Sequence, residues 1–404
     1  MGSSGSGYLC SFLMNMGLVM FWVSLPYLAK DWFQAGPGLL GLIGGATGGA
    51  YVVTCLLAGK IARRLRRDRV MVLGALVSLG AALAAGFAPS VWFLVGIAVV
   101  GSVGNGLFWP ALEARLSVGA RSAELQHRMG WFNLSWSSGE MTGAVVGGVL
   151  YTLGKGLVGW TNFAYLQTLP FLVTVVLCVA VGLLAWKRLG DSASDDPPGD
   201  PETRELPPAP ARPGAPLLPV FWTIALLANC AAAAFRGILI NVFPDLGKGV
   251  LHYSALQWGV LFAMVPLSRT LMFLYWQRHR RWAYQAGYLF GFQALFPLAA
   301  VVLIFNSSYA VFLVVFLAIG VAMSKTYVAS IYYGMDIDHS HQERGGVHEA
   351  ALGSGNAVGT PLAGWFASAS GWVRAPYLFA FVFLTAGILL QAWLYFAGKR
   401  VSRS

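Results

Sequence analysis

RMGWFNLSWSSGEMTGAVVGG, residues 128–148, aligns without a gap to RGGVHEAALGSGNAVGTPLAG, residues 344–364. One offset of 216 positions gives six identities, which are Arg128 with Arg344, Gly130 with Gly346, Ser138 with Ser354, Gly139 with Gly355, Gly143 with Gly359 and Gly148 with Gly364. A weaker match at an offset of 218 pairs Pro26 with Pro244 and Gly41 with Gly259. Glycines at matching depths in two long segments indicate equivalent helices of a parallel duplication. The sequence therefore predicts a chain built as two repeated halves.

Apolar segments long enough to cross a bilayer recur along almost the whole chain. Of its 404 residues, 57% are hydrophobic and only 11% are charged. A run of about 20 apolar residues spans the hydrocarbon core, and its backbone must be helical there. We therefore expect an all-α polytopic membrane protein with twelve transmembrane helices, at residues 8–29, 37–58, 70–88, 91–112, 128–151, 163–186, 219–242, 254–276, 284–305, 309–333, 346–370 and 374–396.

The repeat divides these spans into two bundles of six, at residues 8–186 and 219–396. The segment between them, residues 187–218, contains SASDDPPGDPETRELPPAPARPGAP, whose prolines, acids and small residues cannot build a core. We expect a flexible cytoplasmic linker there and a cytoplasmic tail at residues 397–404. Residues 1–7, MGSSGSG, have the composition of an expression-tag remnant and are set aside.

The placement of basic residues gives the orientation. Of the 27 lysines and arginines, 20 fall in the even-numbered loops, the linker and the tail, 4 fall on the opposite side, and 3 lie inside spans. Basic loops stay in the cytoplasm, so both termini are expected there, in a multi-pass protein of the bacterial inner membrane. The net charge of +11 then reflects topology, and nucleic acid is not expected as a partner.

Several classes of chemistry have no sequence signal. The four cysteines lie inside apolar runs without paired spacing, so neither disulfides nor a metal site is expected. The glycine-rich residues 41–49 lack the Lys-Ser/Thr of a phosphate loop, and no catalytic motif is present. We therefore expect no enzyme activity, no cofactor and no metal. The chain is expected to act as a monomer, and without an ATPase motif any work it does must draw on an ion or substrate gradient.

Two halves of six spans, each with a basic second loop, resemble the major facilitator superfamily of transporters over essentially the whole chain. The family's loop signature runs Gly, x, Leu, Ala, Asp, Arg, then Gly and basic residues. GKIARRLRR at residues 59–67 keeps the first glycine, the alanine and the basic tail, but Arg63 replaces the aspartate and Arg66 the second glycine. The resemblance implies two pseudo-symmetric bundles that work by alternating access.

The fifth span carries Gly139-x-x-x-Gly143-x-x-x-Gly147-Gly148, similar to the family motif associated with antiporters, with Ala144 in place of its proline. Small residues at every fourth position let two helices approach closely. We expect these glycines and their repeat mates to pack the interface between the halves; the set is Gly139, Gly143, Gly355 and Gly359. The likeness to the antiporter motif slightly favours export.

Four ionisable residues fall near the middle of spans, where each costs at least ~2.5–3.5 kcal/mol. They are Arg236, Arg269, Lys325 and Glu140, the only acid at comparable depth. In the family, the first, fourth, seventh and tenth helices line a central cavity, which implies that Arg236 and Lys325 face it. Three cations against one carboxylate favour an anionic substrate held by guanidinium groups. The alternative is internal pairing of Glu140 with one of the cations.

Two places could carry a coupling proton. Glu140 is the first, because protonation of a buried carboxylate paired with a cation can follow the conformational cycle. His348 and Glu349, at the start of the eleventh span, are the second, although a helix N-terminus also favours Glu349 for ordinary capping reasons.

Amides and aromatic residues at similar depth complete the expected binding site. They are Asn15, Asn105, Trp109, Trp136, Asn229 and Tyr327, together with Trp22, Phe108, Asn133 and Asn356. As a set they suit an amphipathic or aromatic molecule. The sequence thus predicts a secondary active transporter of a small organic anion or amphipathic molecule, proton-coupled. The alternatives are broad multidrug efflux, or transport of a lipid or lysolipid on the same scaffold.

Overall fold

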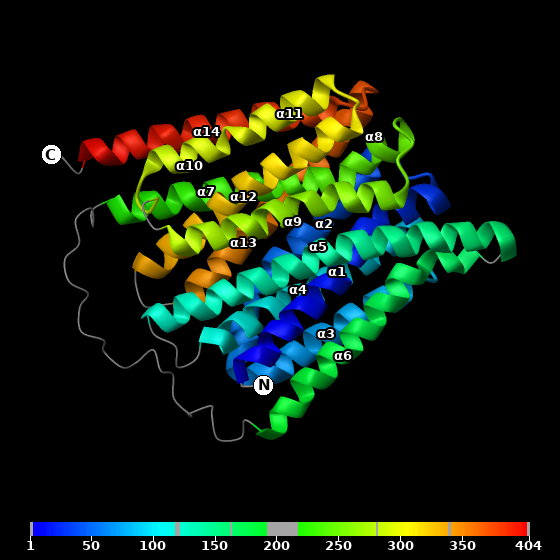
Figure 1. Ribbon diagram of the computed structural model, residues 1–404, viewed down its shortest axis with the longest axis horizontal. Helices are drawn as coiled ribbons and strands as arrows, with labels where there is room; N and C mark the ends of the chain where they lie inside the picture. Colours follow the sequence, from blue (N-terminus) through cyan, green and yellow to red (C-terminus); the bar gives the residue numbers. More distant parts are fainter. Residues whose placement is uncertain are drawn as a thin grey trace.

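The computed structural model describes residues 3–117, 122–161, 164–191, 217–279, 282–337 and 341–401, and all its regular elements there are helices. In chain order they are α1 (Ser3–Phe33), α2 (Pro37–Arg64), α3 (Arg67–Ala85), α4 (Val91–Ser117), α5 (Ser122–Thr161), η1 (Ala164–Thr168), α6 (Leu169–Asp191), α7 (Leu218–Gly237), η4 (Ile238–Val242), α8 (Phe243–Gly249), α9 (Ala255–Arg278), α10 (Ala286–Gln293), α11 (Leu295–Phe305), α12 (Tyr309–Ile337), α13 (His341–Ser370) and α14 (Ala375–Val401). The long helices lie side by side along one direction (Figure 1).

Twelve membrane-crossing passages account for these helices, as predicted. Within the described residues, eleven segments are long and apolar enough to cross a bilayer. The twelfth passage is α13, which is 30 residues long but carries glycines, serines and the polar residues His348, Glu349 and Asn356. It packs mainly against α2 and α7, and its polar residues are therefore sheltered from lipid by protein.

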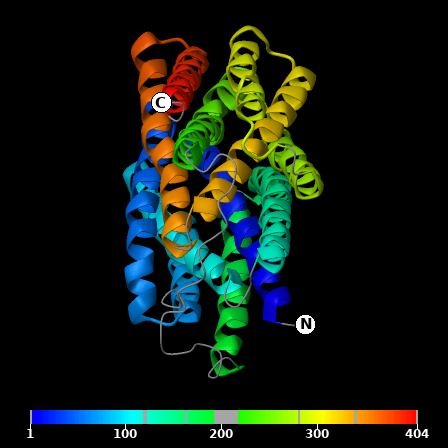
Figure 2. The same ribbon diagram turned by 90° about the vertical axis from the view of Figure 1, so that its left-hand side faces the viewer.

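The two halves meet along two seams. α13 of the second half packs on α2 of the first, and α9 packs on α5. Figure 2 shows these two pairs on opposite sides of the molecule. We name the end at which α1 begins and α14 ends the terminal end, on the left in Figure 1, and the opposite end the distal end. The arrangement leaves a central space between the seams, which the next section describes.

Both chain ends differ somewhat from the predicted boundaries. α1 begins at Ser3, so residues 3–7 of the segment that was set aside continue the first helix. Gly7 there lies against the side chain of Leu116 in α4. Most of the predicted linker (residues 192–216) and the end of the tail (residues 402–404) lie outside the described residues.

The glycine stripe does not pack where the sequence placed it. A Cβ on Gly139 or Gly143 would come below 3.0 Å from the backbone of α1, which belongs to the same half. Gly355 and Gly359 lie equally close to α7, within the second half. The expectation that these four glycines form the interface between halves is therefore wrong. Positions four apart share one helix face, and that face is turned to the neighbour within the bundle.

Gly148 is the residue of this motif that reaches the other half. It follows Gly143 by five residues, which turns it about 140° around the helix axis. A Cβ there would meet the backbone of Ala255 and Leu256 in α9. The repeat mate Gly364 lies in the same way against Pro37 and Gly41 of α2. The internal repeat therefore extends to the contacts that join the halves.

Replacing Gly143 by alanine is expected to destabilise the protein by about 1–3 kcal/mol, because the new methyl group would push α1 away from α5. Gly49→Ala in α2 is the matched control, since nothing lies within 4 Å of its Cβ position. That change should be neutral or stabilise by about 0.5–1 kcal/mol. Thermal unfolding of the two purified variants checks this, and equal melting temperatures would contradict the packing described.

The seventh passage contains a wide helical turn beside the central space. Pro244 has no N–H to donate to the carbonyl of Ile240, so the regular ladder fails there. The N–H of Phe243 donates instead to the carbonyl of Ile238, five residues back, and the Asn241 side chain donates to the carbonyl of Gly237 at 3.0 Å. Such turns are frequent at functional sites. This one presents Ile240 and Asn241 to the cavity.

Reciprocal ion pairs join the halves at the distal end. Lys30 of α1 lies 2.5 Å from Asp245 of α8, and Lys248 of α8 lies 2.6 Å from Asp31 of α1. The Tyr151 hydroxyl also donates to Asp31 at 2.9 Å. We name Lys30, Asp31, Asp245 and Lys248 the distal lock. Lys30 and Lys248 correspond under the offset of 218, so the two lysines of the lock follow the symmetry of the repeat, although the two aspartates do not correspond.

Candidate functional site

A cavity of about 230 Å³ lies between the two halves. Helices α1, α2, α4 and α5 line it from the first half, and α7, η4, α9, α12 and α13 from the second. The structure places twelve of the predicted site residues on its wall, which are Asn15, Trp22, Asn105, Trp109, Trp136, Glu140, Asn229, Arg236, Arg269, Tyr327, Glu349 and Asn356. Residues far apart in the sequence, in both halves, therefore line one cavity.

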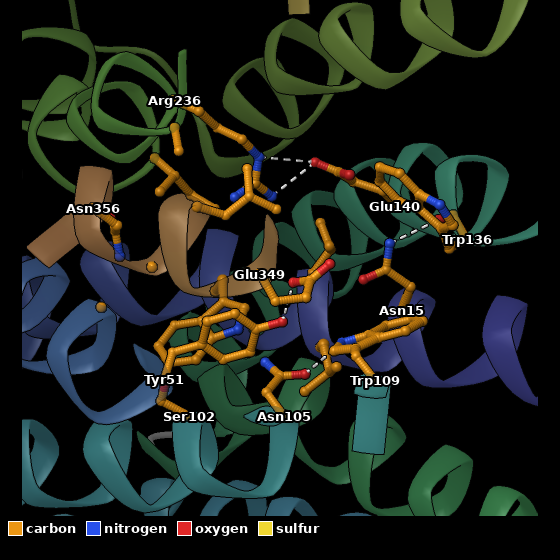
Figure 3. A pocket seen from close by; sticks show the side chains of 18 of the residues that line it. Asn15, Tyr51, Ser102, Asn105, Trp109, Trp136, Glu140, Arg236, Glu349 and Asn356 are labelled. Carbon is orange, nitrogen blue, oxygen red and sulfur yellow. Dashed lines mark hydrogen bonds and ion pairs between the residues drawn. The ribbon is translucent and has the colours of Figure 1, made fainter. Parts of the chain in front are cut away.

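Glu140 joins two arginines across the interface between the halves. Its Oε1 accepts from Nε and Nη2 of Arg236 at 3.2 and 2.8 Å, and its Oε2 accepts from Nη2 of Arg269. Arg269 also donates to Ser137 on α5, at 3.2–3.3 Å. Figure 3 shows the pairing of Arg236 with Glu140 at the cavity wall. We name Arg236, Glu140 and Arg269 the charged triad; it carries one net positive charge.

The two arginines of the triad differ in exposure. The Arg269 side chain is 3% exposed, and its guanidinium lies 4.3 Å from the centre of the Trp136 ring. The Arg236 side chain is 31% exposed. Among the described residues, its Nη1 has no hydrogen-bond partner. The buried Arg269 thus neutralises the charge of Glu140. Arg236 presents to the cavity N–H groups that have no hydrogen-bond partner within the described residues.

The rest of the wall is aromatic and amide-rich. Trp109 donates through Nε1 to Oδ1 of Asn105 at 2.9 Å, and Asn15 donates to the backbone carbonyl of Trp136 at 2.7 Å. The Trp136 and Tyr327 rings lie 5.2 Å apart, centre to centre. These contacts hold the tryptophan and tyrosine rings on the wall of the cavity that the charged triad also lines. A planar or aromatic group could lie there while its acidic group reaches Arg236.

Two further carboxyl groups line the cavity, and only one of them was predicted. Glu349 of α13 accepts from the Tyr51 hydroxyl of α2 at 2.5 Å (Figure 3). Glu113 of α4 lies on the same wall. The predicted fourth span ended at residue 112, whereas α4 continues to Ser117 and carries Glu113 into the cavity. Tyr51 was missed as well, because a tyrosine within an apolar span carries no signal of its own.

The charge balance of the cavity therefore corrects the sequence analysis. Arg236 and Arg269 face three carboxyl groups, not one, so the expected positive surplus does not extend over the whole cavity. The positive group is confined to the triad, and Glu113 and Glu349 form a separate acidic group on the same wall. The site is bipolar.

His348 lies behind the wall and not on it. Its ring is buried, with 2% exposure. Nδ1 lies 2.8 Å from the Ser330 hydroxyl and 3.5 Å from the Asn229 amide nitrogen. Nε2 has no hydrogen-bond partner among the described residues and lies 4.0 Å from Oε1 of Glu349. His348 therefore lies next to Glu349 without lining the cavity itself.

Lys325 corrects another prediction, because it does not face the cavity. Met323 and Tyr327 of α12 line the cavity, and Lys325, two residues from each, points to the other side of the helix. Its Nζ lies 3.5 Å from the centre of the Trp282 ring and 5.2 Å from that of Trp276. The ammonium is fully buried and has no hydrogen-bond partner in the described part of the chain.

Lys325→Met is therefore expected to leave substrate affinity unchanged and to raise the melting temperature. Cation–π contacts are worth about 2 kcal/mol when desolvated, which is less than the cost of burying an ammonium without an acceptor. Methionine fills nearly the same volume without that cost. Thermal unfolding and substrate titration of the variant check the prediction. Loss of substrate affinity would return Lys325 to the binding site.

Within the described residues, no group of three or more His, Cys, Asp or Glu side chains could hold a metal ion. Asp68 of α3 pairs with Arg115 of α4 near the terminal end. This pair lies next to the basic loop in which Arg63 replaces the aspartate of the family signature. It joins two helices of one half, and so it does not bridge the halves.

Comparison with known proteins agrees with this architecture. The sequence model of the Major Facilitator Superfamily matches residues 7–347. No curated protein matches the sequence. Among solved structures, a bacterial homologue of the human lysosomal transporter Spinster, inward-facing and unoccupied, has a TM-score of 0.71 and 16% identity, and the match covers 98% of this chain and 96% of that one.

Two further solved structures are similar. The same Spinster homologue in its inward-facing, occupied form has a TM-score of 0.71 and 15% identity over 98% of this chain and 96% of that one. The nucleoside transporter NupG has a TM-score of 0.64 and 11% identity over 100% of both chains. Likeness at these identities concerns the fold. On the family match, the chain belongs to the Major Facilitator Superfamily and is a multi-pass membrane transporter, not an enzyme.

Proposed function

We propose that the protein is a proton-coupled secondary active transporter of a small organic anion with an aromatic or apolar portion. The observation that carries this proposal is the partly exposed side chain of Arg236 in a cavity between the two halves. Arg269 offsets the charge of Glu140, and so Arg236 can bind a carboxylate, sulfonate or phosphate without leaving a buried carboxylate uncompensated. Such charge-assisted, bidentate contacts are strong and directional.

The aromatic wall supports the second part of the proposal. Trp109, Trp136 and Tyr327 line the same cavity as Arg236, and the indole N–H groups of the two tryptophans donate to the side chains of Asn105 and Asn133. An aromatic ring buried there gains about 25 cal/mol per Å² of apolar area removed from water. Lipophilic cations, which broad efflux would require, meet a guanidinium at the same place.

The orientation follows from charge. Basic residues gather at the terminal end, which the positive-inside rule assigns to the cytoplasm. The distal lock and the close contact of Gly148 with α9 join the halves at the opposite end. The conformation is therefore proposed to be closed toward the outside, with alternating access requiring these contacts to break. The glycine stripe that favoured export packs α5 on α1, so direction is argued below from the proton site.

Transport by the purified protein in liposomes tests the proposal. Benzenesulfonate and phthalate are suitable probes, because both combine an aromatic ring with a group that stays ionised and do not cross lipid as neutral acids. Uptake of either should be saturable and should fall at least tenfold in Arg236→Gln, since loss of a charged hydrogen-bonding partner costs about 1.5–3 kcal/mol. Lys325→Gln is the matched control and should transport normally.

Two outcomes would overturn the proposed substrate class. One is uptake of both anions at the rate of empty liposomes. The other is saturable uptake of the lipophilic cation tetraphenylphosphonium that does not respond to Arg236→Gln, which would favour broad efflux instead.

A further inference from the structure

We propose that Glu113 and Glu349 share the coupling proton, with Tyr51 and His348 as positioning residues, and that this proton crosses the membrane in the same direction as the anion. The inference rests on the function proposed above and adds to it a proton site and a direction. Neither residue belongs to the charged triad. Glu113 comes from α4 of the first half and Glu349 from α13 of the second. The affinity of the pair for a proton therefore depends on the relative position of the two halves.

Potential hydrogen-bond donors lie on two sides of the Glu349 carboxyl group. The Tyr51 hydroxyl donates to Oε2 at 2.5 Å from α2. On the other side, the buried His348 ring directs its unpartnered Nε2 toward Oε1 at 4.0 Å. Nδ1 of His348 lies within 2.8 Å of the Ser330 hydroxyl, which can donate to it and so leave the proton of a neutral ring on Nε2. A small shift would complete that hydrogen bond when Glu349 is ionised.

Glu113 gives Glu349 a second carboxyl group in place of a cation. The charges of the two groups act on each other, and a Cβ on Gly345, at the start of α13, would lie 3.6 Å from Oε2 of Glu113. Among the residues that the structure describes, no Lys or Arg pairs with either group. Two carboxylates that share a poorly hydrated space cannot both ionise without cost, and one bound proton removes that repulsion.

Among the side chains that the structure describes, four titratable groups outside the charged triad face this pair. Tyr51 and Cys55 face it from α2, Tyr327 from α12 and His348 from α13. Beyond Tyr327 lie Arg269 and Glu140 of the triad, whose charges also act on that tyrosine. Because the guanidinium of Arg269 is bound to Glu140, it does not serve as the counter-ion of the acidic pair. Within the described residues, Glu113 and Glu349 therefore lack a basic counter-ion, and a bound proton can take its place.

The sign of the coupling follows from placing both sites in one cavity. An anion on Arg236 adds negative charge near Glu113 and Glu349 and thereby favours proton binding by the pair. Linkage is reciprocal, so the protonated pair binds the anion more tightly by the same factor. For two unit charges about 12 Å apart at an effective dielectric constant of about 20, such a factor is on the order of tenfold. Positive linkage means that the anion and the proton are bound together and move together.

Because the anion and the proton move together, an inward proton gradient drives uptake of the anion into the cytoplasm. Protonation also removes the repulsion between Glu113 on α4 and Glu349 on α13, two helices of different halves. A carrier that has bound the anion without the proton keeps this repulsion together with the added negative charge, so movement of the loaded carrier depends on the proton. The empty carrier returns without either.

Liposomes loaded with the pH-sensitive dye pyranine test the inference, with inward gradients of benzenesulfonate as the probe. The wild-type protein should acidify the lumen as the anion enters. Glu113→Gln and Glu349→Gln should lose at least nine-tenths of this proton influx while still exchanging labelled for unlabelled anion across the membrane. Glu124→Gln, an exposed residue of α5, is the control and should behave like wild type.

His348→Gln tests the positioning role. Loss of a ring donor beside ionised Glu349 should move the pH of half-maximal uptake upward, an effect that a purely structural change would not produce. Proton influx at the wild-type level in both glutamine variants would overturn the proton site, as would lumen alkalinisation on anion entry, which would show antiport. If anions do not move even by exchange in the wild-type protein, the proposed function fails, and this inference fails with it.

Discussion

Glu140→Gln is expected to lower the melting temperature by many degrees and to stop net transport. The wild-type carboxylate compensates two guanidinium groups, and Arg269 beside it is almost fully buried. Glutamine leaves two like charges in the interior without a counter-ion. Removing one partner of a buried ion pair typically costs about 3–5 kcal/mol.

A bound anion should partly rescue this variant, because it restores the missing negative charge. Saturating benzenesulfonate is therefore expected to raise the melting temperature of Glu140→Gln more than that of wild type. The control is Glu124→Gln on the same helix, which removes an exposed pair with Arg128 worth about 0–1 kcal/mol. If Glu140→Gln had the melting temperature of the wild type and the anion did not raise it further, the triad would not be the charged centre of the site.

The second large effect concerns the distal lock. Asp31→Asn combined with Asp245→Asn is expected to shift the protein toward a conformation open at the distal end and to slow anion uptake at least tenfold. Together the changes remove the carboxylates that pair with Lys30 and Lys248, and leave each lysine only a backbone carbonyl as acceptor among the described groups. The closed state then loses two half-buried ion pairs, whereas a distally open state, in which water reaches the lysines, loses little.

Spin labels at residues 36 and 250, in a variant whose native cysteines are replaced, measure the change. Both positions are exposed near the distal ends of the two halves, and the label-to-label distance should lengthen in the double variant. Exchanging the charges, with Lys30→Asp and Asp245→Lys, should restore the shorter distance. Lys155→Gln is the control, because Lys155 is 55% exposed and contributes a redundant contact to Asp31. An unchanged distance in the double variant would mean that packing alone closes this end.

The sequence predicted the parts of this protein that depend on repetition and on polarity. The matched segments at residues 128–148 and 344–364 became α5 and α13, which contact α1 and α7 in equivalent ways. Polar residues deep in apolar spans were expected to share one space, and the structure brings Arg236, Glu140 and Arg269 into contact there. Membrane burial makes such residues expensive, and three of the four, all but Lys325, line the cavity.

The sequence could not predict which face of each helix lines the cavity, or where a helix ends beyond its apolar run. Lys325 was expected to face the cavity, yet a helix places residues two apart about 200° around its axis, and Tyr327 occupies the cavity face. A glycine stripe shows that two helices are close without saying which two. Glu113 was lost because an apolar run that ends at residue 112 gives no sign that the helix continues to Ser117.

A structure of the protein with phthalate or benzenesulfonate bound tests the central claim most directly, which is that an anion binds to Arg236 between the halves. An oxygen of the acidic group should lie about 2.7–2.9 Å from a guanidinium nitrogen of Arg236, with the ring against Trp136 or Tyr327. Density for the anion elsewhere, with Arg236 still bound only to Glu140, would contradict it.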